Sequence, residues 1–369
     1  MTAHLETLDG KQGHFASLLR RGLSAHAIFF VIAIGYLAAL KITGLFVPAV
    51  ANSSMLELAV GIITFSVPVA FLSLTLYTFG TMVLGDRPDK PIKVLWQRVK
   101  TVLTSPEKMA AGVPMFVSLI LFMFAFTAFK ANIPVLVPFS WDVTFDQWDK
   151  VIHFGHRPWE LLQPILGYAP ITWALNVNYN LWFFTMNLFW VHYAFIAAPG
   201  KERTRFFLAF MLITAVLGTL FATLYSSAGP AYFTRLGLSP DPYADLMAYL
   251  NTVKQSYPLW ALDTQDMLWA YKQEGSVFGG ISAMPSIHNA TALLFVLAVW
   301  HKSPILRTIM MAHALLIFLA SVHLGWHYAV DSYIAWPVAA ILWWLAGRLS
   351  NWWESRPQVQ DFNGVVSHV

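Results

Sequence analysis

Long apolar runs separated by polar segments dominate the pattern of this chain. Eight of these runs qualify as membrane spans, because the hydrocarbon core of a bilayer requires about 20 apolar residues per helix. They lie at residues 25–47, 57–84, 109–130, 171–197, 205–225, 286–301, 305–322 and 328–347. The pattern therefore predicts an all-α polytopic membrane protein with about eight transmembrane helices.

Positive charges are unevenly distributed between the segments that join these runs. Of the 23 lysines and arginines, 16 fall in the alternate set of segments that includes both chain ends, and seven fall in the other set. Because basic residues accumulate on the cytoplasmic side of a membrane, we expect both termini in the cytoplasm. Residues 1–24 are polar and the first apolar run is too long for a signal peptide, which predicts a retained anchor.

The predicted spans divide the chain into three regions. Residues 1–108 hold a cytoplasmic tail, two extra spans and a cytoplasmic loop, residues 109–347 form a six-helix core, and residues 348–369 form a cytoplasmic tail. Two long outer segments belong to the core. The first, 138–170, alternates aromatic and charged residues and is interpreted as an interfacial amphipathic helix. The second, 226–285, contains two short amphipathic stretches and is interpreted as a binding element or as an interfacial cap without substrate contact.

Composition narrows the class of protein further. The chain is 57% hydrophobic and 11% charged, whereas a soluble domain carries about 25% charged residues. The absence of cysteine excludes disulfides, thiolate catalysis and Cys-based metal sites. A net charge of +4 gives no reason to expect a nucleic-acid partner. The absence of eukaryotic-looking tails favours a bacterial inner membrane.

Two polar stretches carry the candidate chemistry. Gly279 to His288 ends the second outer segment and opens the sixth span, and His323 to Asp331 opens the eighth. The predicted topology places both stretches at the outer face. Because a single helical hairpin separates them, the two span starts are expected to be neighbours in space.

These stretches supply the groups that a phosphoryl transfer requires. His327 and Asp331 are four residues apart and share one helix face, so the carboxylate can fix one imidazole tautomer and leave the other nitrogen as a nucleophile. His288 lies in the first turn of its helix, where it can act as a general acid beside backbone N–H groups that suit a phosphate. Asp331 begins an apolar run, where an ionisable group is costly and usually functional.

The same stretches resemble two signatures of the type-2 phosphatidic acid phosphatase superfamily. Pro285-Ser286-Ile287-His288 is similar to the second signature, usually Pro-Ser-Gly-His, and Leu324 to Asp331 is similar to the third, which ends in His-x-x-x-Asp. The resemblance covers residues 109–347. It implies that His327 becomes phosphorylated, that Asp331 orients it and that His288 protonates the leaving group. It also implies that no metal or other cofactor is needed.

The chain departs from the phosphatase branch of that superfamily in its basic residues. The first signature carries Lys and Arg-Pro, but here no base occurs between Ser226 and Arg235, and Ser321 stands where the third signature begins with Arg. With Ile287 in place of Gly, this pattern resembles the inositol phosphorylceramide synthase branch. That resemblance implies transfer of a phospho-headgroup from a lipid phosphoester to a lipid or polyol alcohol. The candidates for substrate binding are Ser286, His323, Tyr232 and Arg235.

Three alternatives remain open at this point. A lipid phosphatase acting on a glycerolipid or polyprenyl phosphate would use the same residues and release phosphate. A transporter or scramblase would use the buried His and Asp side chains to relay protons or gate a path. The spacing of His323, His327 and Asp331 could also hold Zn²⁺.

In the fourth span, Asn176, Asn180 and Asn187 are expected to bridge helices or to contact a headgroup.

Overall fold

The computed structural model describes residues 2–47 and 55–366, and within these ranges the chain is helical and contains no strand. Six helices of this described part are long and apolar enough to cross a membrane. They are α2 (Ala27–Phe46), α4 (Met55–Leu84), α6 (Pro106–Leu136), α10 (Lys201–Ala215) with its continuation through η2 (Val216–Phe221) and α11 (Ala222–Leu224), α15 (Pro304–His323) and α16 (Ala329–Glu354). The prediction of a polytopic all-α membrane protein is confirmed.

The two other predicted spans coincide with helices of the same bundle. α9 (Ala169–Val191) packs against α4 and α15 and is continued by η1 (His192–Ile196), and α14 (Ile287–Val299) packs against α10, α15 and α16. α14 has only 13 residues, a length of about 20 Å at 1.5 Å per residue. It is shorter than the six spanning helices, and it carries His288 in its first turn.

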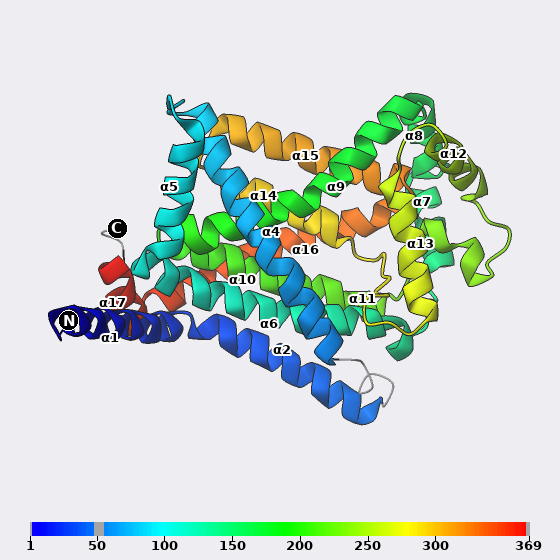
Figure 1. Cartoon of the computed structure of the whole chain (residues 1–369). Coiled ribbons are helices and arrows are strands. Elements are labelled where there is room, and N and C mark those ends of the chain that lie inside the picture. Colours follow the sequence, from blue (N-terminus) through cyan, green and yellow to red (C-terminus); the bar gives the residue numbers. More distant parts are fainter. Residues whose placement is uncertain (1, 48–54, 367–369) are drawn as a thin grey trace.

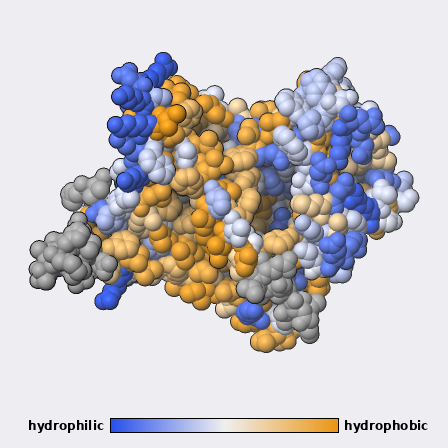
Figure 2. All heavy atoms as spheres, viewed as in Figure 1, coloured by the Kyte–Doolittle hydropathy of each residue, from blue (hydrophilic) through white to orange (hydrophobic). Residues whose placement is uncertain are grey.

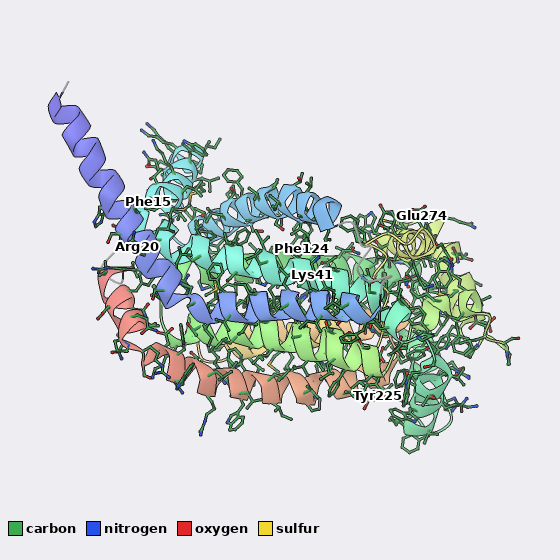
Figure 3. The ribbon with its side chains drawn as sticks, turned by 90° about the horizontal axis from the view of Figure 1, so that it is seen from below. Phe15, Arg20, Lys41, Phe124, Tyr225 and Glu274 are labelled. Atoms are coloured by element: carbon green, nitrogen blue, oxygen red, sulfur yellow. The ribbon has the colours of Figure 1, made fainter. Side chains whose placement is uncertain are left out.

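Shorter helices gather at the two ends of the bundle (Figure 1). One end carries α1 (Thr2–Ala25), α5 (Pro91–Thr104) and α17 (Pro357–Val366), with α1 packed against α17. The opposite end carries a polar cap, by which we mean α7 (Asp142–Ile152), α8 (Pro158–Leu166), α12 (Ala244–Lys254) and α13 (Trp260–Gln273), together with the short turns η3 (Pro230–Tyr232) and η4 (Thr234–Leu236). Figure 3 shows the same separation, with Arg20 of α1 at one end and Glu274, next to α13, at the other.

Aromatic side chains fill the middle of the bundle. Phe122 of α6, Phe206 of α10 and Phe295 of α14 are fully buried there. The rings of Phe295 and Phe189 stack with centroids 4.7 Å apart, a separation typical of favourable aromatic pairs. Figure 2 shows a broad apolar surface around this core, flanked by hydrophilic residues. The bundle therefore presents to lipid the surface that its composition predicts.

Local sequence signals fix several helix starts. Ser105 caps α6 by accepting a hydrogen bond from the Lys108 amide at 3.2 Å, and Pro106 follows as the first helical residue. Within 226–285, α12 and α13 lie where two short amphipathic helices are predicted. Within 138–170, two helices, α7 and α8, are present instead of one.

Candidate active site

The starts of α14 and α16 lie side by side. Ser286 caps α14, since its hydroxyl accepts a hydrogen bond from the Asn289 amide at 3.4 Å. The Ser286 amide in turn donates to the backbone oxygen of Asp331 in the first turn of α16, also at 3.4 Å. The Asn289 side chain adds a bond to the Ser321 hydroxyl of α15 at 3.2 Å. The two polar stretches singled out by the sequence are thus joined directly.

His327 and Asp331 form a buried pair. The Nδ1 atom of His327 lies 3.0 Å from Oδ2 of Asp331, and the same oxygen accepts the Tyr328 amide at 3.1 Å. Asp331 is fully buried and His327 is 6% exposed. A proton on Nδ1 that is donated to Asp331 leaves the Nε2 lone pair of His327 free to attack an electrophile.

His288 faces His327 across a short gap. The centroids of the two imidazole rings are 6.2 Å apart. Aromatic rings of α9 hold His288 from the side, with the Tyr179 ring stacked at 4.7 Å and the Trp182 ring at 4.0 Å. A tetrahedral phosphorus group between the imidazoles would have one histidine on the attacking side and the other near the leaving oxygen.

Both histidines line one cavity of about 200 Å³. Figure 2 shows a hollow with hydrophilic walls between the apolar surface and the polar cap. Its walls come from α6, α9, α13 and the two helix starts, and they include Lys130, Tyr179, Trp182, Tyr232, His288 and His327. The volume is sufficient for a phosphate with a compact organic group.

Three loops close the cavity at the cap end. Ala283 donates its amide to the Ser227 oxygen at 2.9 Å, and the Ala231 amide donates to the Gly325 oxygen at 2.8 Å. Gly229 adopts a φ of +105°, and a Cβ there would lie 2.6 Å from the Trp326 oxygen. Only glycine satisfies both the backbone conformation and this close approach. The loop at 226–231 is therefore fixed against both histidine-bearing stretches.

Two aspartates of α7 brace these loops. Asp142 accepts hydrogen bonds from the Ala228 and Gly229 amides at 3.0 and 2.8 Å, and from the Tyr328 hydroxyl at 2.9 Å. Asp149 accepts the Ala329 and Val330 amides at 2.8 and 2.9 Å. The N–H groups at the start of α16, which have no partner within the helix, thus donate hydrogen bonds to a carboxylate. The carboxylate also stabilises the positive end of the helix dipole.

The sequence interpretation of α7 as an interfacial amphipathic helix missed this role. Asp142, Asp146 and Asp149 are 2–3% exposed and share the buried face with Phe145. In an interfacial helix the acidic and aromatic residues occupy opposite faces. The spacing of the three aspartates relative to Phe145 is the signal that could have revealed a buried acidic face.

Burial shifts the pKa values of three groups near the start of α16. Burial and the positive charge of Lys130 lower the pKa of His327 to about 3, so its ring is neutral at pH 7. Burial raises the pKa of Asp149 to about 7, against the effect of the two amides that it accepts. Burial and the neighbouring Asp142 raise the pKa of Tyr328 well above its usual value, so its hydroxyl stays a donor.

The four candidates for substrate binding have different positions. Tyr232 lines the cavity, and its hydroxyl donates to the Gln265 oxygen at 3.2 Å. Ser286 is the helix cap described above and is not part of the cavity wall. Arg235 lies outside the cavity wall and pairs with Asp266. His323 is fully buried with Nε2 2.9 Å from the Thr172 hydroxyl, also away from the wall.

The possibility of a zinc site finds no support in the geometry. In the described ranges, no group of three His, Asp or Glu side chains is placed to hold a metal ion. His323 forms its hydrogen bond with Thr172, as described above.

Two asparagines of α9 have different positions. The side-chain oxygen of Asn176 accepts a hydrogen bond from the Ala261 amide of α13 at 3.0 Å and so bridges two helices, whereas Asn180 lines the cavity.

Comparison with known proteins gives one match. A family model described as the PAP2 superfamily matches residues 144–345, more than half of the chain, and both histidine-bearing stretches lie within the matched segment. No curated protein and no solved structure is similar enough to give a match.

Proposed function

The chain belongs to the PAP2 superfamily, and from this premise we propose that it is an integral membrane phosphotransferase that moves a phospho-headgroup between lipid substrates. The carrying observation is the placement of His288 and His327 across one cavity, with His327 oriented by Asp331. The proposed catalytic unit is the six-helix core at 109–347, which contains the whole family match.

The proposed reaction has two displacement steps. Nε2 of His327 attacks phosphorus, the ester P–O bond breaks, and protonated His288 gives its proton to the departing alkoxide. Neutral His288 then takes the proton of an acceptor hydroxyl, whose oxygen attacks the phosphohistidine and breaks the P–N bond. The phospho-headgroup ends on the acceptor, and both histidines return to their starting states.

Several features support a lipid donor and an alcohol acceptor. The cavity lies beside the apolar surface of the bundle, within reach of a headgroup whose chains remain in the bilayer (Figure 2). Trp182, Phe183 and Trp326 contribute apolar side chains to the cavity wall, and a site from which bound substrate displaces water favours transfer over hydrolysis. The similarity of the motifs to the inositol phosphorylceramide synthase branch supports the same choice. The charge distribution supports an active site on the extracytoplasmic face, with both termini in the cytoplasm.

Mass spectrometry of lipid products tests this proposal. Purified protein in nanodiscs is incubated with a mixed lipid extract, beside His327→Ala and the exposed-site control His301→Ala. We expect a new phosphorylated lipid and a donor without its headgroup phosphate in the wild type and in His301→Ala, and neither product in His327→Ala.

Each other outcome selects a different function. Inorganic phosphate and the bare alcohol as the only products would make the protein a lipid phosphatase. Unchanged lipids together with a lipid or proton flux that His327→Ala alters would make it a transporter or scramblase. Full turnover in His327→Ala would overturn the role of this histidine.

A further inference from the structure

Lys130 is the one lysine in the cavity wall. It lies on α6, six residues before the end of that helix at Leu136, or about 9 Å along the helix axis. The wall contains no Asp or Glu, and within the described ranges Lys130 has neither an ion-pair nor a hydrogen-bond partner. The cavity therefore holds a cation whose charge no protein group balances.

An unpaired ammonium group among membrane helices is energetically unfavourable. Removing a cation from water costs several kcal/mol, and intramembrane lysines normally pair with an anion or line a substrate path. Folding alone gives no reason to keep Lys130, because an apolar residue would fill the same position without this cost. The position is explained if an anion occupies the cavity during function.

The backbone at Gly280, in the loop before α14, packs closely against this lysine. A Cβ at Gly280 would lie 3.0 Å from Cγ of Lys130 and 3.3 Å from the amide nitrogen of Ala131. Gly280 thus lets the loop before α14 rest on the stem of the lysine. This packing restricts the stem of Lys130, so fewer side-chain conformations are lost when the ammonium group binds an anion, which favours affinity.

We propose that Lys130 is the phosphate-binding cation of this enzyme. The proposal rests on the proposed function, because it assigns the phosphate of the lipid phosphoester to the space between Lys130, His288 and His327. It also explains the missing bases of the sequence: residues 226–234 and position Ser321 lack the basic residues of the phosphatase branch. Lys130 lies before the family-matched segment 144–345, so the cation comes from outside that segment.

The experiment compares Lys130→Met and Lys130→Arg with the control Lys41→Met. Lys41 is an exposed lysine on the neighbouring helix α2 (Figure 3). Binding of inorganic phosphate to each full-length protein in nanodiscs is measured by calorimetry, and Tm is measured without phosphate. The same variants are made with His327→Asn, so that binding is read without turnover.

We expect Lys130→Met to weaken phosphate binding by about 10-fold or more, the scale of a lost charge-assisted hydrogen bond. Lys130→Arg should retain binding within about threefold, and Lys41→Met should match the wild type. Without phosphate, the Tm of Lys130→Met should equal or exceed that of the wild type, because the variant removes an unbalanced charge. A residue with a merely structural role would lower Tm instead.

Two results separate this inference from the proposed function. If Lys130→Met binds phosphate as tightly as the wild type while lipid transfer proceeds, Lys130 is not the phosphate-binding cation and the proposed function stands. If no lipid is processed but phosphate binding still depends on Lys130, the anion site stands and the proposed function fails.

Discussion

At the start of α16, carboxylates fix the groups around His327, whereas at the start of α14 His288 lies between aromatic rings. Asp331 accepts a hydrogen bond from the imidazole of His327, and Asp142 accepts one from the Tyr328 hydroxyl. Asp149 accepts hydrogen bonds from two backbone amides. In the described ranges, the imidazole of His288 has no hydrogen-bond partner and is positioned by Tyr179 and Trp182.

The difference matches what each proposed role demands. A nucleophile must keep one tautomer and one orientation, which a buried carboxylate enforces. A residue that gives a proton in one step and takes one in the next must keep its ring nitrogens available to two different oxygens. Aromatic faces position such a ring without occupying its nitrogens.

The largest effect is expected from Asp331→Asn, which removes the orienting charge from His327 and leaves the helix intact. We expect kcat to fall by about 10⁴-fold, the scale seen when the orienting acid of a catalytic histidine is neutralised. The measurement is the rate of phosphoenzyme formation in rapid-quench experiments, beside Asp361→Asn on α17 as control. A rate within threefold of the wild type would show that the Asp331 carboxylate does not orient the nucleophile.

A smaller and more selective effect is expected from His288→Ala. The loss should reach about 10²-fold for alkyl phosphoesters, whose leaving oxygen needs a proton. It should nearly vanish for an aryl ester such as a p-nitrophenyl phosphoester, whose leaving group departs as an anion. Rates for a series of esters give the comparison. An equal loss across the series would contradict the role of His288 as an acid.

The smallest effect is expected from Asp149→Asn. It should appear as a change in how Tm depends on pH. The pKa of Asp149 is raised to about 7, above about 3.9 for an aspartate in an unfolded chain. The folded state therefore binds this proton more tightly. The resulting stabilisation is complete below about pH 4 and is lost as the pH rises through about 7.

Between about pH 5 and pH 8, we consequently expect the Tm of the wild type to fall more than that of Asp149→Asn. Tryptophan fluorescence during heating provides the measurement, with the exposed Asp245→Asn of α12 as control. Parallel pH profiles for all three proteins would exclude a raised pKa at Asp149.

The parts of the site that the sequence predicts are local in the chain. The four-residue spacing of His327 and Asp331 fixes their contact once a helix begins there, and the Pro-Ser pair before His288 fixes the start of α14. Apolar runs likewise predict the helices of the bundle, because lipid selects them by length and hydropathy.

The supporting groups depend on contacts between distant segments, and for that reason the sequence does not reveal them. Lys130 is one of seven basic residues assigned to the outer segments, and nothing in its neighbours distinguishes it. His323 follows the pattern of a site residue, yet its place in the last turn of α15 directs it to Thr172 of α9. Helix packing, which no short motif encodes, decides both outcomes.

The hydrogen bonds from α7 to the start of α16 would make the proposed catalysis depend on a helix outside the six candidate spans. Local unfolding of a surface helix requires less free energy than unfolding of a buried core. Release of α7 would leave the amides of Ala329 and Val330 without their carboxylate and Gly229 without Asp142. The spanning helices could then remain intact in a protein that has lost the proposed activity, so we expect heat or denaturant to abolish turnover before the helix content falls.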